Sequence, residues 1–332
     1  MTLTKILTMW FILTIWVLAG DFHSRHFELV KINDDIYAAI HKPGGSAICN
    51  AGIIDMGDYV IIFDSFMTTI AARDLRDAAN HLFNKPIRFV INSHGHSDHI
   101  RGNQIFPEAT VIGTELMRTF IMEKSQPGNE KSRLDERINK IRLSLKEGAE
   151  NNGELEKQLH YYLDLKKSLE ELKLTLPNLS INNEIIIRGQ NRRVVLHEYK
   201  SGHSISDIIL HIPEDSVLFT GDLIFNNTHP NMRDSYPGSW ITNLDSLLLY
   251  SPRIVIPGHG EIGGIEIIHK MKSYFHTLEQ ISAEAIRKGL NLEESEQVPM
   301  MPEIYKSYNF PYFYRSNLLK MVNYLKSRNS LE

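Results

Sequence analysis

Residues 92–103 read NSHGHSDHIRGN, and they carry the strongest chemical signal in the chain. His94 and His96 are two positions apart, so in an extended strand end both imidazoles project to one side and can meet one metal ion. A turn that follows directly can bring Asp98 and His99 toward a second metal ion. This spacing predicts a metal site at the end of a β-strand.

Three further metal-binding candidates follow strand-like runs later in the chain. The run RRVVLHEY precedes His203, SVLFT precedes Asp222 and RIVIP precedes His259, just as IRFVI precedes the first histidine cluster. In layered α/β folds the loops beyond the carboxyl ends of the strands converge on one functional edge. We therefore expect all seven candidates to share one cleft, and most other histidines to lie in the core or on the surface.

The composition is that of an ordinary globular protein. The 332 residues are 42% hydrophobic and 23% charged, with a formal net charge of -4. This charge offers no broad cationic surface for phosphates, so nucleic acid is not expected as a partner. Cys49 is the only cysteine in the sequence, which excludes an intramolecular disulfide and a thiolate zinc cluster. Any metal must then be held by nitrogen and oxygen.

The order of apolar runs predicts a layered α/β fold. Short β segments separated by turn signals open the chain from Phe27 to Phe63 and predict a β-meander. A helix is expected from Thr68 to Phe83, with a β-branched run after it. Farther along, β-rich segments alternate with expected helices at Trp240–Leu249 and Gly264–Lys288. Alternation of this kind favours helices packed on sheets.

The segment between about residues 129 and 177 departs from this pattern. Apolar residues recur there at helical spacing on both sides of the sequence ENNG, which predicts an inserted helical hairpin. We expect residues 21–295 to form the α/β domain and residues 296–332 a helical extension that packs on its core. The hairpin could be a pair packed on the surface, a lid over the active site or a dimerisation arm, because periodicity reveals a buried stripe but not its partner.

The motifs HGHSDH, GHS at 202–204, TGD at 220–222 and PGHG at 257–260 together closely resemble the metallo-β-lactamase superfamily. The resemblance covers the chain from about Phe27 to Lys288, apart from the insertion, and four motifs in the same order make it specific. It implies a four-layer αβ/βα sandwich with two metal ions at one edge of the sheets.

The same resemblance implies a role for each candidate residue. Asp222 would bridge the two metals, as in the hydroxyacylglutathione hydrolases and lactonases that the sequence resembles. Asp64, at the end of the run VIIFD, would support a ligand rather than bind metal itself; the alternative is an ordinary turn aspartate. The first metal would be held by His94, His96 and His203, and the second by Asp98, His99 and His259.

Such a donor set implies a hydrolytic mechanism. Imidazoles and carboxylates suit two zinc ions per chain, and also tolerate iron or manganese. Water bound to zinc has its pKa lowered to about 7, so a bridging hydroxide could attack the carbonyl of an ester, lactone, thioester or amide. Asp98 would orient the nucleophile and could shuttle a proton.

Several other functions remain open. A β-lactamase proper is one, although Asp222 stands where acquired enzymes carry a cysteine ligand. Iron-dependent oxygen or sulfur oxidoreductases use the same fold, but the di-iron oxygen reductases usually carry a glutamate where His96 stands. Similar lactonases tend to carry a tyrosine where this chain has Phe225. Hydrolysis of glutathione thioesters is also less favoured, because the chain has no evident basic C-terminal motif for that substrate. A non-catalytic metal-binding protein is the last alternative.

The loop FNNTHPNMRDSYPGSW follows Asp222 and is polar and rich in turn residues, so we expect it to border the pocket. His229 in this loop is a candidate substrate contact. The alternative is that His229 orders a turn that contains proline.

The N-terminal segment has the pattern of a secretory signal. Lys5 precedes an apolar run from Ile6 to Gly20 that ends in small residues. A transmembrane helix needs about 17 to 25 apolar residues, which favours a cleaved signal over residues 1–20 and a secreted or periplasmic protein, with a membrane anchor as the alternative. We expect a small-molecule substrate, no membrane partner after cleavage, and a homodimer through the insertion as a further possibility.

Overall fold

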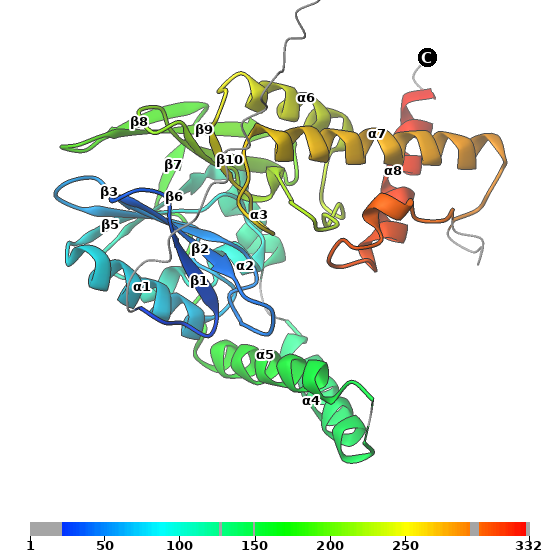
Figure 1. Ribbon diagram of the computed structural model, residues 1–332, viewed down its shortest axis with the longest axis horizontal. Coiled ribbons are helices and arrows are strands. Elements are labelled where there is room, and N and C mark those ends of the chain that lie inside the picture. The colour runs from blue at the N-terminus through cyan, green and yellow to red at the C-terminus, as the bar shows by residue number, and fades with distance from the viewer. Residues whose placement is uncertain (1–21, 126–127, 149, 293–298, 330–332) are drawn as a thin grey trace, which may run out of the picture.

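Two β-sheets stacked face to face form the body of the protein, and helices cover their outer faces (Figure 1). The computed structural model describes residues 22–125, 128–148, 150–292 and 299–329, so the expected signal segment 1–20 lies outside the described residues. Helix α1 covers the first sheet, and α6 and α7 cover the second. The predicted four-layer αβ/βα architecture is therefore confirmed.

The first sheet has seven strands in the order β1-β2-β3-β4-β5-β6-β7. The pairs from β1 to β4 are antiparallel, as the predicted meander requires, and the pairs from β4 to β7 are parallel. Parallel strands place their carboxyl ends at a common edge. The strands are β1 (Phe27–Lys31), β2 (Ile36–His41), β3 (Ala51–Asp55), β4 (Val60–Phe63), β5 (Ile87–Ile91), β6 (Thr110–Thr114) and β7 (Leu179–Ile181).

The second sheet has five strands in the order β12-β11-β10-β9-β8. Its pairs are antiparallel except for β11 and β12, which run parallel. The strands are β8 (Glu184–Arg188), β9 (Arg193–Lys200), β10 (Ser206–Ile212), β11 (Val217–Phe219) and β12 (Ile254–Ile256).

Helices link and cover the strands. The long predicted helices are confirmed with boundaries that differ by at most a few residues. The helices are α1 (Thr69–Phe83), α2 (Ser97–Ile100), α3 (Glu115–Lys124), α4 (Glu130–Lys146), α5 (Asn152–Glu171), α6 (Pro237–Leu248), α7 (Ile265–Arg287) and α8 (Phe313–Asn329), with 3-10 turns at η1 (Asn103–Ile105), η2 (Gly221–Leu223) and η3 (Glu303–Tyr305).

Three apolar clusters fill the spaces between the four layers. Successive residues of a strand face opposite sides of the sheet, so Ile53 packs against α1 whereas Ile54 packs between the two sheets. Both faces of the first sheet are buried, which explains why its strands read as continuous apolar runs. Between the second sheet and its helices, Trp240 of α6 and Phe275 of α7 are completely buried.

The expected helical insertion is a hairpin of α4 and α5 that stands out from the layered body on the side of α1 (Figure 1). Helix α8 packs against α7 and α6. Within the described residues, no helix combines the length and the apolar character that a membrane span requires.

Two details differ from the sequence-based expectation. One of the short β segments expected between Phe27 and Phe63 was the run AICNAGII at 47–54, but β3 begins only at Ala51, and Ile48 in the preceding loop has a φ of 73°. Strands β6 and β7 were not predicted, because they are short and their pairing partners lie far away in the sequence.

Candidate metal centre

Four strands deliver the seven predicted ligands to one edge of the stacked sheets. Each ligand group follows the carboxyl end of a strand: His94 follows β5, His203 follows β9, Asp222 follows β11 and His259 follows β12. His96 caps the short helix α2, which contains Asp98 and His99. The ligand atoms form two groups, within each of which all atoms lie within 4.8 Å of one another: His94, His96, His203 and Asp222 in the first, and Asp98, His99 and His259 in the second.

In the first group, three imidazole nitrogens face one another. Nδ1 of His96 lies 2.9 Å from Nε2 of His94 and 3.0 Å from Nε2 of His203. Oδ2 of Asp222 lies 3.2 Å from Nε2 of His203 and 3.7 Å from Nε2 of His94. The four atoms surround one small volume, as the ligands of a single metal ion do.

The second group lies on the other side of the Asp222 carboxylate. Oδ2 of Asp98 is 3.3 Å from Nε2 of His259 and 3.6 Å from Nε2 of His99. Oδ1 of Asp222 lies 3.2 Å from Nε2 of His99 and 3.3 Å from Nε2 of His259. Asp222 therefore turns one oxygen to each group, the arrangement expected of a bridging carboxylate.

The buried atoms of the cluster fit a pair of divalent cations. Nε2 of His99 and Oδ1 of Asp222 are buried and have no hydrogen-bond partner among the described residues, although such atoms are rarely left without a partner in a folded protein. Imidazole nitrogens and carboxylate oxygens are ligands that zinc, manganese and iron accept. A cation in each group would satisfy these atoms.

Burial and charge prepare the ligands for metal binding. Burial lowers the pKa of His203 to about 3 and lowers that of His94 well below its usual value, so both rings are neutral and can offer a lone pair. Burial would raise the pKa of Asp222, but the positive charges of His259 and His99 hold it well below the usual value. Asp222 is therefore ionised at neutral pH.

Asp64 contacts the ring nitrogen of His99 that does not face the second group. Its Oδ2 lies 2.8 Å from Nδ1 of His99, and its Oδ1 accepts a hydrogen bond of 2.7 Å from the backbone N–H of Ser93. The contact with Asp64 leaves Nε2 of His99 facing the second group. The structure thus places Asp64 where a ligand-supporting residue would lie, not at an open turn.

Two glycines allow the strand ends to approach closely. A Cβ atom on Gly258 would lie 2.0 Å from Oδ1 of Asp222, and one on Gly221 would lie 2.4 Å from Cβ of Ser93. Gly221 also has a φ of +51°, which glycine adopts without strain. The glycines of TGD and PGHG are therefore required by packing around Asp222.

Asp234 is a site residue that sequence reasoning missed. Its Oδ2 lies 3.1 Å from Nε2 of His96, and this hydrogen bond is the largest cause that lowers the pKa of Asp234. Since Nε2 faces Asp234, Nδ1 of His96 faces the first group. The loop after Asp222 was expected to border the pocket, but no local pattern connects one of its acids with a histidine far upstream.

The structure does not bring His229 to the cluster. Its side chain is buried, with Nδ1 2.9 Å from the hydroxyl of Tyr274 and Nε2 3.2 Å from the backbone oxygen of Tyr305. Both ring nitrogens are engaged in the packing of α7 against the C-terminal segment, and neither faces the seven candidate ligands. Cys49 is also buried, and its thiol donates to the backbone oxygen of Asp98.

The cluster is accessible along one side. The side chains of Asp98, His96 and His259 are 22%, 12% and 9% exposed, whereas those of His94, His99 and His203 are fully buried. The cluster is therefore open to solvent at Asp98, His96 and His259. A cavity of about 920 Å³ is lined by Asp234 and Phe120, which both contact His96, although none of the seven ligands lines it directly.

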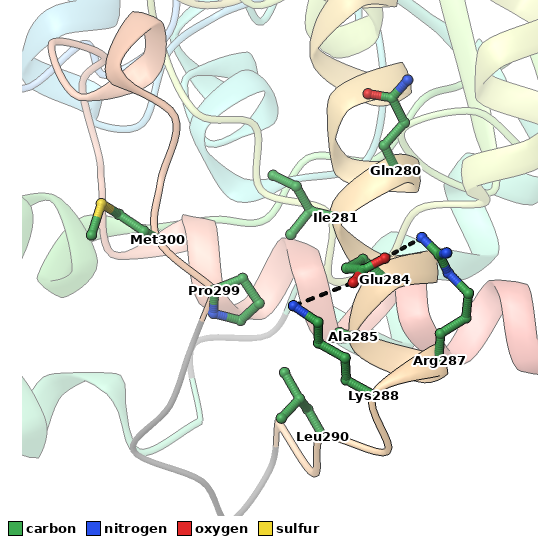
Figure 2. A pocket seen from close by; sticks show the side chains of 9 residues that line it. All are labelled: Gln280, Ile281, Glu284, Ala285, Arg287, Lys288, Leu290, Pro299 and Met300. Carbon is green, nitrogen blue, oxygen red and sulfur yellow. Dashed lines mark hydrogen bonds and ion pairs between the residues drawn. The ribbon is translucent and has the colours of Figure 1, made fainter.

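A second pocket, of about 440 Å³, lies at the C-terminal end of α7 (Figure 2). Glu284 at its wall forms ion pairs with Arg287 and Lys288. It is lined neither by the seven candidate ligands nor by Asp234 or Phe120, which contact His96. This pocket is therefore separate from the candidate metal centre.

Comparisons with known proteins agree with this arrangement. A family model described as the Metallo-beta-lactamase superfamily matches residues 44–259. The chain is 27% identical over 115 residues to the metallo-beta-lactamase type 2 of Bacteroides fragilis, which covers 33% of this chain and 45% of that protein. It is 34% identical over 111 residues to the alkyl/aryl-sulfatase BDS1 of Saccharomyces cerevisiae, which covers 30% of this chain and 17% of that protein. The chain thus matches less than half the length of either relative.

Solved structures share the fold at low sequence identity. A metallo-beta-lactamase from Pontibacter korlensis superposes with a TM-score of 0.56 at 14% identity, over 75% of this chain and 99% of that one. A metallo-beta-lactamase from Hirschia baltica superposes with a TM-score of 0.54 at 19% identity, over 76% of this chain and 98% of that one. Similarity at this level of identity establishes the fold alone.

Proposed function

Because the chain belongs to the metallo-beta-lactamase superfamily, we propose that it is a dinuclear metal hydrolase that cleaves an ester, lactone, thioester or amide bond. The observation that carries this proposal is the Asp222 carboxylate, which turns one oxygen to each of two groups of facing ligand atoms. Two cations held in this way are the basis of hydrolysis in many two-metal sites.

Each group of residues has a distinct part in this proposal. Asp222 would bridge two cations, for which zinc is the first choice and iron or manganese the alternatives. Bound cations would make water available as a nucleophile near neutral pH and polarise the scissile carbonyl. The first cation would be held by His94, His96 and His203, and the second by Asp98, His99 and His259.

Asp98 has a second part in the proposed reaction. Its side chain is the most exposed of the seven, and its Oδ2 lies 3.3 Å from Nε2 of His259. The positive charges of His99 and His259 lower the pKa of Asp98 against the effect of burial, so the group is a carboxylate at neutral pH. A carboxylate at the open side can orient a water molecule and accept its proton.

A sulfate ester is a second substrate class that one observation favours. The relative with the higher identity bears the name of an alkyl/aryl-sulfatase, although the match covers a small part of it. A β-lactam is a further candidate substrate, because the other relative bears the name of a metallo-beta-lactamase. Redox chemistry at iron and a non-catalytic metal-binding role remain the alternatives outside hydrolysis.

The decisive experiment combines metal analysis with a substrate panel. Purified protein should contain about two zinc ions per chain and hydrolyse at least one chromogenic ester, lactone, thioester, sulfate ester or β-lactam, and a chelator should remove the activity. The His96→Ala protein serves as the control for contaminating hydrolases. Two metals per chain without turnover of any substrate would contradict the proposal.

We further propose that the protein is exported, from the apolar pattern of residues 6–20. Sequencing the N-terminus of the mature protein from a native host tests this, since a start near residue 21 indicates cleavage of a signal. A homodimer through the helical insertion is a separate proposal. Light scattering should then give the mass of a dimer for wild type and that of a monomer for a variant that lacks residues 129–177.

A further inference from the structure

The cavity of about 920 Å³ is enclosed by segments that are far apart in the sequence. Its principal walls are Phe120 of α3, residues 233–239 and 242 in the loop and first turns of α6, and residues of α8 between 320 and 327. Sites for small organic molecules typically have volumes of about 300 to 1,000 Å³. The cavity is therefore large enough for an organic ligand.

Direct contacts join the walls of this cavity to one another. Nζ of Lys320 in α8 donates a hydrogen bond of 3.0 Å to the backbone oxygen of Arg233 in the loop before α6. At the start of α6, a Cβ atom on Gly238 would lie 2.3 Å from the hydroxyl oxygen of Tyr324 in α8. Since α8 is held against both the loop and α6, the cavity is preformed.

The charged side chains that line the cavity are two cations, Arg233 and Lys320, and one carboxylate, Asp234. This carboxylate is already engaged, because its Oδ2 lies 3.1 Å from Nε2 of His96 and accepts a hydrogen bond of 3.2 Å from Nε of Arg233. Within the described part of the chain, no carboxylate forms an ion pair with Lys320, whose ammonium donates to a backbone oxygen. The lining therefore carries an excess of positive charge, which favours an anionic ligand.

Aromatic rings form a large part of the remaining lining. Phe120, Tyr236 and Tyr324 all line the cavity, and Tyr236 is 41% exposed although its ring is large and mostly apolar. Aromatic side chains in a concave site contact the apolar part of a ligand, while a few polar groups fix its orientation. Cations beside aromatic rings thus favour an organic anion with an aromatic body over a small inorganic anion.

Two of the lining residues connect the cavity to the first ligand group. Asp234 contacts Nε2 of His96, and the ring of Phe120 lies 5.8 Å from the ring of His96, measured between centroids. Nδ1 of the same imidazole lies 3.0 Å from Nε2 of His203. A molecule that fills the cavity therefore has one end beside the outer edge of His96.

We propose that this cavity recognises the anionic end of the substrate. Lys320 and Arg233 would bind the acidic group, the aromatic rings would contact the apolar body, and the scissile bond would lie toward His96. The inference rests on the proposed hydrolytic function and deepens it, because it assigns the substrate to the organic anions with an aromatic body. Lys320 and Arg233 are then specificity-determining residues.

The test measures binding to the metal-free protein, in which no bound cation can hold an acidic ligand. Wild type, Lys320→Gln and the matched control Lys326→Gln are titrated with naphthalene-2-sulfonate and with its neutral analogue naphthalene-2-sulfonamide. Glutamine at position 320 keeps an amide donor for the backbone oxygen of Arg233 but carries no charge. Lys326 is exposed on α8 and does not line the cavity, so its substitution removes the same charge outside the site.

Wild type should bind the sulfonate more tightly than the sulfonamide. Lys320→Gln should bind the sulfonate about three- to tenfold more weakly than wild type, because it loses one charge-assisted hydrogen bond at a half-buried position. Its affinity for the neutral sulfonamide should remain that of wild type, since this ligand has no charge for Lys320 to recognise. Lys326→Gln should bind both ligands as wild type does.

Each contrary result has its own meaning. Wild type that does not prefer the sulfonate would overturn the anion site. Equal sulfonate affinity of wild type and Lys320→Gln, or equal weakening in the two variants, would overturn the role of Lys320. Equal weakening of both ligands in Lys320→Gln would overturn charge recognition and assign Lys320 a role in the shape of the cavity. All these results are obtained without metal, so they leave the proposed hydrolase standing.

A second measurement tests the link between the cavity and the metal centre. In zinc-loaded wild type, naphthalene-2-sulfonate should inhibit turnover of the substrate found in the panel competitively, and it should inhibit Lys320→Gln about three- to tenfold more weakly. Sulfonate that binds but leaves turnover unchanged would overturn the role of the cavity in substrate recognition. A protein that binds the sulfonate and hydrolyses no substrate would refute the proposed function instead, and the cavity would remain an anion site without a substrate role.

Discussion

The carboxylate of Asp64 lies 2.8 Å from Nδ1 of His99, although the two residues are 35 positions apart in the sequence. Asp64 has a φ of 61°, a left-handed conformation that aspartate and asparagine tolerate better than most residues. This strand-end conformation directs the side chain to both Ser93 and His99. The residue that directly follows β4 therefore contacts a predicted metal ligand.

Asp64→Asn should weaken the second metal site more than the first. Asparagine keeps the backbone conformation, but its amide cannot accept from both Ser93 and His99. Loss of such a supporting hydrogen bond typically lowers metal affinity 10- to 100-fold, and we expect a loss of about this size at the second site. Calorimetric titration of the metal-free variant should show a lower metal affinity at one site and a near wild-type affinity at the other. If both affinities equal those of wild type, Asp64 does not support His99 in metal binding.

His96→Ala should remove a ligand of the first metal and abolish measurable turnover. The loss in kcat should be about 10²- to 10³-fold or more, the scale seen when a group that stabilises transition-state charge is removed. Metal content should fall while the circular dichroism spectrum stays near that of wild type, because the side chain is not part of an apolar cluster. Full activity in this variant would refute the site assignment.

Asp234→Asn should reduce the affinity of the first site by up to about tenfold, at the low end of the usual range because Asp234 is partly exposed. Asparagine can still accept a hydrogen bond from His96, but it lacks the negative charge. Arg233→Ala is the control, since Arg233 contacts the same carboxylate from the solvent side. A metal titration in which Arg233→Ala loses as much affinity as Asp234→Asn would assign the effect to the loop.

Removal of divalent cations should lower the melting temperature of the protein. A ligand that binds only the folded state stabilises it, by about 2.7 kcal/mol at a free concentration one hundred times its Kd. Calorimetric scans with and without a chelator should therefore differ for wild type. The difference should nearly vanish for Asp222→Ala, which loses the bridging carboxylate; an equal shift in that variant would indicate metal binding elsewhere.

The pH dependence of stability should contain a contribution from His229. Burial lowers the pKa of His229, whereas the unfolded chain keeps a value near 6.5. The unfolded state thus binds more protons as the pH falls below about 6.5, and the stability that the neutral ring contributes is lost.

Urea unfolding of metal-free protein at pH 7.5 and pH 5.5 tests this. The loss of unfolding free energy on acidification should be smaller in His229→Gln than in wild type. His276→Gln, at an exposed position of α7, is the control and should behave as wild type does. If His229→Gln loses as much stability on acidification as wild type, His229 is not part of the acid response.

Local sequence determined the layers and the seven candidate ligands. The spacing of His94 and His96 and the position of Asp222 and His259 just after apolar runs are properties of short segments. The strands themselves are readable because residues such as Ile53 and Ile54 must be buried on both faces of a sheet. Helical spacing likewise predicted α4 and α5 as a hairpin.

Only the tertiary structure decided which residues support the cluster and which do not. Asp234 meets His96 across 138 positions. The inserted hairpin meets the body through contacts of Asp164 with Arg25 and of Ser168 with Thr69. His229, which lies in the same loop as Asp234, is turned into the C-terminal core instead. Such pairings arise from packing between distant segments, and the periodicity of one segment holds no information about its partner.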